Sequence, residues 1–497
     1  MMRPLLTREK SLQSAAAIVG IESVSDLHFT GISFDSKAIQ PGDIFCAFPG
    51  LNAHGADFAG EAEALGAVAI LTDVAGAAKC GKLLPLIVPN PRRAAALLSA
   101  WFYDDPMRAM FSVGITGTNG KTTTTMLLNQ LWQLAGRESG LIGTVETRIG
   151  VERIASSRTT PEAPELQALV ATMRERHIRD FVMEVSSHSI ALERVRGSHF
   201  NVVGFTNLTQ EHLDFHGDME SYFNTKRKIF TFEFADLAVI NIDSTYGAAL
   251  SKSCEIPQLT LSNKDKSADW HYVAIDAVSA GYQVAIRGRG GILIETLIPL
   301  HGDYNLENAL MAIAIAAESG MDPIDIARIA PALTGAPGRL QQVAVGQSFT
   351  ALVDYAHSPD AVERVLATAR KIAEARSTSS KVIAVLGCGG DRDATKRAPM
   401  GKALLAGSDI AIFTSDNPRS ESAEEILEEM CKGLTIKKPH QVIVDRRKAI
   451  ESAVALASGD DILLVLGKGH EVGQEIYGVI HPFDDRVVLG EAIAGVA

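Results

Sequence analysis

A glycine-rich turn between an apolar strand and a helix narrows the possible folds of this chain more than any other feature. The turn reads Gly-Thr-Asn-Gly-Lys-Thr at residues 117–122, after the apolar run 111–116 and before a helical stretch at 121–135. Glycines let main-chain N–H groups point inward at phosphate oxygens, and the helix N-terminus adds partial positive charge. The strict pattern has a glycine where Ile115 stands. The order of strand, turn, Lys-Thr and helix nevertheless predicts a P-loop.

Around this turn, short apolar runs rich in β-branched residues alternate with helical stretches along all 497 residues. Such alternation is typical of α/β domains with parallel sheets. Residues 270–300 are an exception, because they read as antiparallel strands around a Gly-Arg-Gly-Gly turn at 288–291. Strands are predicted at 31–36, 43–48, 67–72, 83–88, 111–116, 181–186, 202–207, 237–242, 381–387, 409–415, 441–445 and 461–467, and helices at 93–103, 121–135 and 305–319.

Two breaks divide the chain. Asp104, Asp105 and Pro106 interrupt the first helical stretch, and a segment with Pro and Gly at 334–339 follows a later one. This length ordinarily corresponds to several domains. We therefore predict three α/β domains: a smaller N-terminal domain over 1–108, a central P-loop domain with a mostly parallel sheet over 109–337, and a C-terminal Rossmann-like domain over 338–497.

Composition excludes several classes of protein. Forty-seven basic and 59 acidic residues give a net charge of −12, which argues against a protein that clamps nucleic-acid backbones. No apolar run approaches the ~18–20 residues that span a bilayer, and the N-terminal segment lacks the apolar core of a signal peptide. The five cysteines form no CxxC pair, so we predict neither disulfides nor a zinc knuckle. These features indicate a cytoplasmic protein without a membrane span.

An ordered set of short motifs follows the P-loop along the chain. It contains Thr-Thr-Pro-Glu, Met-Glu-Val-Ser-Ser-His, Glu-His-Leu-Asp, a lysine, His-Gly-Asp-Tyr-Asn-Leu-Glu-Asn, Pro-Gly-Arg and Asp-Tyr-Ala-His. Taken together, and over nearly the whole chain, this set closely resembles the Mur ligase family of peptidoglycan synthesis. The motifs begin at residues 159, 183, 211, 226, 301, 337 and 354.

Three further motifs refine this resemblance. Gly-Cys-Gly-Gly-Asp-Arg-Asp at 387–393, Asp-Asn-Pro-Arg at 416–419 and Gly-Lys-Gly-His-Glu at 467–471 each stand at the end of a predicted strand. They look like the MurE-type members of the family, and the Asn-Pro-Arg form is associated with meso-diaminopimelate rather than lysine. The resemblance implies an ATP-dependent ligase that joins meso-diaminopimelate to UDP-N-acetylmuramoyl-L-alanyl-D-glutamate through an acyl phosphate. We expect it to act as a monomer.

A magnesium site is predicted beside the P-loop. Glu184 ends one predicted strand and His212 follows another, so a carboxylate oxygen and an imidazole nitrogen could join Thr122 in holding Mg²⁺ on the nucleotide phosphates. In the family, the lysine that matches Lys226 is carbamoylated, which makes it a carboxylate-like ligand for a second Mg²⁺. The resemblance thus implies Lys121, Lys226 and His212 as catalytic residues.

The other nucleotide and substrate contacts are assigned by their place in the motifs. Asn305 opens a predicted helix, from which its amide could bond an adenine ring. Arg339 and Asp354 match family positions for phosphate and ribose. The predicted ATP-binding residues are Gly117, Thr118, Asn119, Gly120, Lys121, Thr122, Thr123, Asn305, Arg339 and Asp354. The resemblance places the UDP-muramoyl-dipeptide at Ser36, Asn52, Thr159, Thr160, Ser186 and Arg194.

The strand-end motifs of the third domain have a direct chemical interpretation. Arg392 and Arg419 follow neighbouring strands, and a guanidinium binds a carboxylate through two parallel hydrogen bonds. Glu471 could pair with an ammonium group. This set suits diaminopimelate, which carries a carboxylate at each end, better than lysine. The predicted amino-acid site comprises Arg392, Asp416, Asn417, Pro418, Arg419, Gly467 and Glu471.

Three alternatives remain open from the sequence. The same ligase could add L-lysine, against which the Asn-Pro-Arg motif argues. A folylpolyglutamate synthetase-like ligase shares the P-loop and ATP domain. That alternative would leave the N-terminal domain and the Asp-Asn-Pro-Arg motif of this chain unexplained. A regulatory P-loop NTPase that binds partners without ligation would not need the three strand-end motifs of the third domain.

Overall fold

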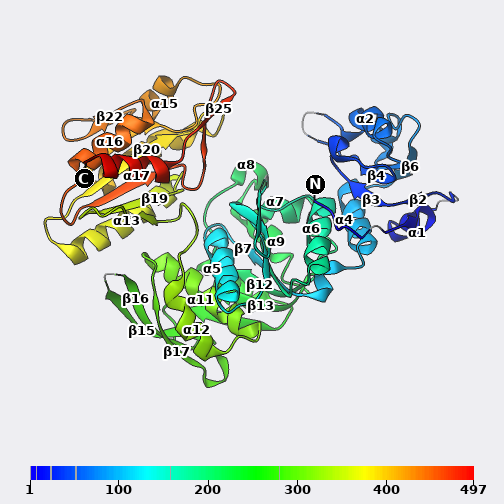
Figure 1. The fold of residues 1–497 in the computed structure, drawn as a ribbon, viewed down its shortest axis with the longest axis horizontal. Helices are drawn as coiled ribbons and strands as arrows, with labels where there is room; N and C mark the ends of the chain where they lie inside the picture. Colours follow the sequence, from blue (N-terminus) through cyan, green and yellow to red (C-terminus); the bar gives the residue numbers. More distant parts are fainter. Residues whose placement is uncertain are drawn as a thin grey trace. The chain divides into compact units, whose positions relative to one another are not determined.

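The computed structural model describes residues 2–6, 8–22, 25–50, 53–156, 158–278 and 280–496. The chain forms two compact units, and each is built on α/β sheets (Figure 1). The predicted α/β fold class, with a mostly parallel central sheet, is confirmed. The three domain limits stay a prediction. One unit comprises Met1–Pro299 and Leu306–Leu333, and the other comprises Leu300–Asn305 and Thr334–Ala497.

A small parallel sheet forms the N-terminal part of the first unit. Side chains of its second strand alternate between two cores: Ile44 and Cys46 face one, and Phe45 faces the other. Helix α4 (Pro91–Phe102) covers the first of these cores, and α2 (Ala59–Ala64) covers the second. Burial on both faces explains why these strands read as continuous apolar runs. The strand order is β3 (Gly31–Ser33), β4 (Asp43–Cys46), β5 (Ala69–Thr72) and β6 (Leu84–Ile87).

An eleven-stranded sheet forms the larger part of the first unit. Its middle strands are parallel, and antiparallel strands extend both edges. The antiparallel pairing predicted for 270–300 is confirmed, whereas the strands β8, β9, β10 and β14 were missed because they are short and partly polar. The spatial order is β10 (Glu152–Ala155), β9 (Glu146–Ile149), β8 (Ser139–Ile142), β11 (Asp180–Glu184), β7 (Phe111–Thr116), β12 (Phe200–Phe205), β13 (Ala235–Asn241), β14 (Gln258–Ser262), β15 (Trp270–Val278), β16 (Gly281–Arg287) and β17 (Leu293–Ile298).

Strand β7 leads directly into the glycine-rich turn. It pairs in parallel with β11 on one side and β12 on the other. Helix α5 (Lys121–Leu134) begins directly after the turn that follows β7. Because carboxyl ends of parallel strands share one edge of a sheet, the glycine-rich turn lies beside the ends of β11 and β12.

A six-stranded sheet forms the core of the second unit. Helices α13 (Pro359–Arg376), α14 (Arg397–Gly407) and α15 (Ala423–Met430) pack on one face. Helices α16 (Arg446–Leu456) and α17 (Asp485–Val496) pack on the other. The four predicted strands are present, although the one expected at 441–445 covers only two residues. The order is β18 (Gln341–Val343), β19 (Thr350–Asp354), β23 (Ile462–Leu466), β20 (Val382–Cys388), β21 (Ile410–Ser415) and β22 (Gln441–Val442), with β18 antiparallel.

None of the described helices combines the length and the apolar composition that crossing a lipid bilayer requires.

Candidate active site

The glycines of the turn at 117–122 are required by close approach. Gly120 has φ +87°, and a Cβ there would lie 2.3 Å from the amide oxygen of Asn308. Gly117 has φ +149°, and its Cβ would lie 1.9 Å from the Thr206 hydroxyl. Both contacts are far below any tolerable distance, so no side chain fits at either position without a rearrangement. The geometry is that of the predicted P-loop.

Hydrogen bonds with the loop after β12 and with Tyr222 hold the P-loop in place. The Thr118 N–H donates to the carbonyl of Asn207 at 2.9 Å, and the Asn119 N–H donates to the Asn207 side chain at 3.0 Å. The hydroxyls of Thr118 and Tyr222 lie 3.1 Å apart. The Lys121 amine curls back onto the loop, where it donates to the carbonyl of Gly117 at 2.9 Å. The loop is therefore preformed.

Glu184 meets the P-loop at the end of β11. It is 1% exposed, and its Oε2 accepts from the Thr122 hydroxyl at 2.9 Å. The main-chain N–H of Thr144 donates to Oε1 at 2.7 Å, and its hydroxyl donates to Oε2 at 3.1 Å. Three donors thus fix a buried carboxylate against the threonine that was predicted to bind Mg²⁺.

Lys226 approaches the same loop from helix α9 (Met219–Arg227). Its side chain is 1% exposed, its Nζ donates to the carbonyl of Gly117 at 2.9 Å, and it lies 4.8 Å from the centre of the Tyr222 ring. Burial, reinforced by Lys121, lowers the pKa of Lys226 well below its usual value. A lysine with a lowered pKa has more of the neutral amine that carbamoylation requires.

His212 belongs to an aromatic cluster beside Tyr222. Its ring centre lies 4.8 Å from that of His188 and 6.3 Å from that of Tyr222. His216 stacks on Tyr222 at 4.8 Å. Burial lowers the pKa of His212, and burial with the neighbouring imidazoles lowers the pKa of His188 to about 4. A lowered pKa favours the neutral imidazole, which is the form in which histidine binds metals.

The donor groups beside the P-loop suit magnesium. Among the described residues, no group of three or more His, Cys, Asp or Glu side chains gathers as a metal cage. Thr122 and Glu184 do meet directly, and a hydroxyl and a carboxylate are the hard oxygen donors that Mg²⁺ prefers. Mg²⁺ commonly takes only one or two protein ligands, with nucleotide phosphates and waters as the others. The residues therefore fit a magnesium ion that arrives with its nucleotide.

The residues predicted for the muramoyl substrate gather around Glu184. The hydroxyls of Thr144 and Thr159 lie 3.0 Å apart, and the Thr160 hydroxyl donates to the carbonyl of Glu184 at 2.8 Å. The Ser186 N–H donates to the Thr160 hydroxyl at 3.2 Å. Four predicted positions therefore lie at one edge of the sheet, since the Arg194 guanidinium also donates to the carbonyl of Thr160 at 3.3 Å.

Glu162 is a residue that the sequence analysis did not assign. It is buried, and its carboxylate pairs with Arg194 at 2.9 Å and with Arg92 at 2.7 Å. Arg92 comes from α4, so Glu162 links this helix to Arg194, one of the residues predicted to bind the muramoyl substrate. The signal was its place in the Thr-Thr-Pro-Glu motif.

Two predictions in the N-terminal part need comment. Ser36 does not end a strand, because β3 stops at Ser33 and Ser36 begins a short 3₁₀ turn capped by Asp35. The Asp35 N–H donates to the Ser33 hydroxyl at 3.2 Å, which turns the chain early. Asn52 lies outside the described residues.

The remaining predicted nucleotide contacts belong to the second unit. Asn305 does not open its helix: α11 (Asp303–Glu318) begins two residues earlier, and the Asn305 amide donates to the carbonyl of His301 at 2.8 Å. The Arg339 guanidinium lies 4.7 Å from the centre of the Tyr355 ring. Asp354 ends β19, and its two oxygens accept from the N–H groups of Leu340 and Ala356 at 2.7 and 2.8 Å. Burial raises the pKa of Asp354.

The three strand-end motifs of the second unit meet at one edge of its sheet. The Asn417 amide, after β21, donates to Glu471, after β23, at 2.8 Å. The Arg419 guanidinium donates to the carbonyl of Gly390, after β20, at 2.6 Å. Gly467 has φ +112°, and a Cβ there would lie 2.6 Å from a carboxylate oxygen of Asp416. The structure thus brings together the motifs predicted to bind the amino acid.

The two predicted arginines differ in their surroundings. Arg419 has φ +55° and is held by main-chain bonds to the hairpin of β24 (Gly473–Ile476) and β25 (Val479–Pro482), with its N–H donating to the carbonyl of Glu475 at 3.0 Å. Its guanidinium also pairs with the Glu475 carboxylate at 3.4 Å. Arg392 is exposed, and no hydrogen bond or ion pair of its side chain is found within the described part of the chain.

A buried ion pair stabilises this edge of the sheet. Arg446 and Asp485 are both fully buried, and two hydrogen bonds of 2.8 and 2.6 Å join them. The same guanidinium donates to the carbonyls of Ser415 and Leu466, the last residues of β21 and β23. The pair therefore ties together two of the strands that carry the motifs.

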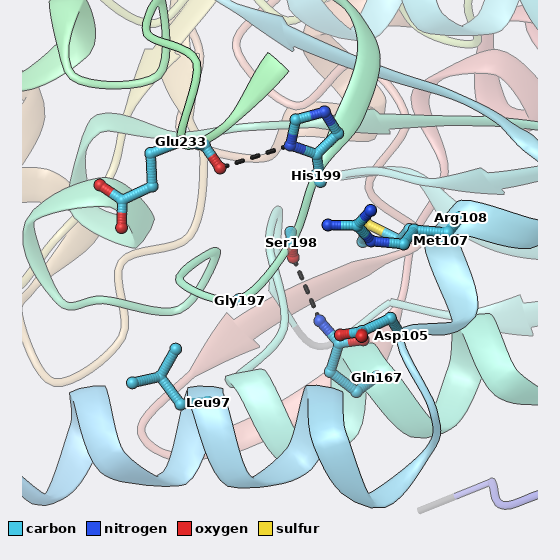
Figure 2. A pocket seen from close by; sticks show the side chains of 9 residues that line it. All are labelled: Leu97, Asp105, Met107, Arg108, Gln167, Gly197, Ser198, His199 and Glu233. Carbon is cyan, nitrogen blue, oxygen red and sulfur yellow. Dashed lines mark hydrogen bonds between the residues drawn. The ribbon is translucent and has the colours of Figure 1, made fainter. Parts of the chain in front are cut away.

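A cavity of about 240 Å³ lies elsewhere in the first unit (Figure 2). It is bordered by α4 and by the segment before β12, where Gln167 donates to the Ser198 hydroxyl at 3.2 Å. None of the predicted site residues lines it. The predicted site lies instead at the carboxyl ends of the strands.

Three family descriptions match this chain. "Mur ligase family, catalytic domain" matches residues 28–100, "Mur ligase middle domain" matches 115–316, and "Mur ligase, glutamate ligase domain" matches 338–469. The matched segments cover the small parallel sheet, most of the eleven-stranded sheet and the six-stranded sheet described above.

Full-length relatives agree with these matches. A Streptomyces coelicolor protein named UDP-N-acetylmuramoyl-L-alanyl-D-glutamate–2,6-diaminopimelate ligase is 46% identical over 99% of this chain and 98% of its own length. The protein of the same name from Streptomyces avermitilis is 47% identical over 94% of this chain and 93% of its own length. A solved structure with that name aligns with a TM-score of 0.69 at 32% identity, over 98% of this chain and 99% of the other. By identity, coverage and fold, this chain belongs to the Mur ligase family.

Proposed function

We propose that this protein is an ATP-dependent, ADP-forming ligase that adds meso-diaminopimelate to UDP-N-acetylmuramoyl-L-alanyl-D-glutamate during synthesis of peptidoglycan precursors. The relatives that cover nearly the whole chain carry the name of this activity. One structural observation supports it most: Asn417 and Arg419, of one strand-end motif, contact Glu471 and Gly390, of the other two, at one edge of the second unit's sheet. That edge offers guanidinium and carboxylate groups to an amino acid with two carboxylates.

The chemistry assigned to the first unit is phosphoryl transfer to a carboxylate. The D-glutamate carboxylate of the substrate attacks the γ-phosphate of ATP, which yields an acyl phosphate and ADP. Lys121 and the N–H groups of the P-loop stabilise the negative charge that develops on the transferred phosphoryl group. The diaminopimelate amine then attacks the activated carbonyl, and phosphate leaves. No side-chain nucleophile is required, because the protein supplies positioning and electrostatics.

Magnesium is part of this proposal. Thr122, Glu184 and His212 would hold one ion, and a carbamoylated Lys226 would be a ligand of a second. Bound Mg²⁺ supplies positive charge to the phosphate oxygens during transfer. The support from the structure is the direct contact of Thr122 with Glu184 and the buried Lys226 with its lowered pKa.

The remaining substrate contacts are also proposals. Thr159, Thr160, Ser186 and Arg194 would hold the muramoyl dipeptide, and Ser36 and Asn52 its uridine diphosphate. Asn305, Arg339 and Asp354 would bind ATP. We further propose that the enzyme is cytoplasmic, since its substrates are phosphorylated cell-wall precursors and ATP. We also propose that it is a monomer with domains at 1–108, 109–337 and 338–497.

Product analysis tests the proposal directly. The enzyme is incubated with ATP, Mg²⁺, the UDP-muramoyl dipeptide and an equimolar mixture of meso-diaminopimelate and L-lysine. The mass of the product is then measured by mass spectrometry. We expect the diaminopimelate adduct with stoichiometric ADP. A lysine adduct would support the alternative ligase. ADP release without either amino acid would support a regulatory NTPase.

A further inference from the structure

Lys468 is buried in the middle of the amino-acid motifs. It lies in the Gly-Lys-Gly-His-Glu segment directly after β23, and its side chain is 0% exposed. Its Nζ donates to the carbonyl of Gly473 at 2.6 Å, to Oδ1 of Asn417 at 3.1 Å and to Oε2 of Glu471 at 3.3 Å. An ammonium group has three N–H donors, so these acceptors use all of them.

The contact with Asn417 determines which way that amide points. Oδ1 of Asn417 accepts from two donors, Lys468 and the N–H of Glu475 at 3.0 Å. A flipped amide would place its NH₂ group against both donors, which is strongly unfavourable. The Nδ2 group must therefore face Glu471, to which it donates at 2.8 Å.

Glu471 is held by one oxygen only. Its Oε2 accepts from both Asn417 and Lys468. Among the described residues, no hydrogen bond to Oε1 is present, and the Glu471 side chain is 32% exposed. One carboxylate oxygen is thus anchored in the protein, and the other is accessible to a ligand.

We propose that Lys468 is a positioning residue of the amino-acid site: its buried ammonium orients Asn417 and anchors one oxygen of Glu471, so that the other oxygen receives the ammonium group of the incoming amino acid. This inference rests on the proposed function and deepens it. Lys468 acts through its two neighbours and does not itself touch the substrate. Preorganisation of this kind improves binding because the side chains need no ordering when the ligand arrives.

The test compares four variants with wild type, each assayed by steady-state kinetics with one substrate varied at a time. Lys468→Met removes the ammonium while keeping an unbranched side chain. Asn417→Ala removes the neighbour, and a double variant combines both. Asp461→Asn is the matched control, because Asp461 is also buried but lies at the opposite, amino end of β23, where it accepts from the N–H of Lys381 at 2.8 Å.

We expect Lys468→Met to raise the diaminopimelate KM at least about tenfold, with the KM values for ATP and the dipeptide changed by less than about twofold. Since Lys468 works through Asn417, the double variant should be no worse than about twofold above the poorer single variant. Asp461→Asn should lower the melting temperature and leave the diaminopimelate KM unchanged. An unchanged diaminopimelate KM in Lys468→Met would overturn the inference. A double variant whose rise in KM equals the product of the two single rises would also overturn it.

Two further measurements keep the test decisive. If Lys468→Met does not fold, Lys468→Gln, which retains one donor group, should show the same selective rise in KM. In a crystal structure of the wild-type enzyme with diaminopimelate, Oε1 of Glu471 should contact the amino acid while Lys468 keeps its three acceptors, and any other arrangement would refute the role. Failure of wild type to ligate diaminopimelate would instead refute the proposed function.

Discussion

The side-chain amine of Lys226 donates to the main-chain carbonyl of Gly117 across 2.9 Å from a position that is 1% exposed. A lysine from helix α9 is therefore anchored to the first glycine of the P-loop, 109 residues earlier in the chain. Because burial and Lys121 lower its pKa, its protonated form is disfavoured in the folded protein.

Lys226 should make stability depend on pH in one direction. Between the lowered folded-state pKa and the unfolded value near 10.4, the unfolded chain binds more protons, so the free energy of unfolding rises with pH. In CO₂-free buffer, the free energy of unfolding of wild type should rise relative to that of Lys226→Met as the pH increases toward about 10, by up to about 1.4 kcal/mol per pH unit. Urea unfolding at several pH values measures this. Parallel curves for the two proteins would contradict it.

Lys226→Ala should be nearly inactive in ligation. If Lys226 carries a carbamoyl group, short-chain carboxylates should partly restore activity, because they could occupy the metal-facing site. Lys228→Ala is the matched control, since Lys228 is exposed two residues later and should be dispensable. An active Lys226→Ala enzyme that does not respond to added acid would show that the residue has only a structural role.

Lys121→Ala should lower kcat by at least about 10²-fold, because Lys121 acts on charge that develops during phosphoryl transfer. The fold should remain intact, since the loop is also held by Asn207 and Tyr222. Product formation and circular dichroism are measured on the same preparation. Near-normal turnover by a folded variant would refute the P-loop assignment.

Arg419→Ala should raise the diaminopimelate KM about tenfold or more, while the KM values for ATP and the dipeptide change far less. A charge-assisted pair with a carboxylate contributes about 1.5–3 kcal/mol. Loss of the guanidinium would leave the distal carboxylate of diaminopimelate without its partner. Arg419→Lys should restore little, because an ammonium is not a planar fork. Unchanged kinetics in Arg419→Ala would remove this residue from the site and favour the lysine alternative.

Two neighbouring arginines should differ sharply in their effect on stability. Arg446→Ala leaves Asp485 buried without a partner and should cost about 3–5 kcal/mol. Arg447→Ala removes an ion pair with Glu491 in which both side chains are about half exposed, and should cost less than about 1 kcal/mol. Denaturant unfolding measures both. Equal losses would mean that the buried pair contributes no more than a surface pair.

Much of this architecture could be predicted because the motifs are local. The P-loop lies within one strand–turn–helix unit, and the strand-end motifs follow runs buried on both faces. Lys468 and Glu162 were missed because their roles depend on partners up to 70 residues away, such as Arg92. Ser36 was placed in a strand because Ser33 looks like any strand residue until its hydroxyl bonds the chain two residues on.

The buried Arg446–Asp485 pair also has a consequence for the order of assembly during synthesis. Asp485 is the first residue of α17, which leaves the ribosome after every other element of the sheet, whereas Arg446 and the carbonyls of Ser415 and Leu466 emerge earlier. Until α17 has docked, the guanidinium lacks the carboxylate to which it is hydrogen-bonded in the folded core. The amino-acid site should therefore mature last, and a nascent or truncated chain that stops before residue 485 should bind nucleotide before it can recognise an amino acid.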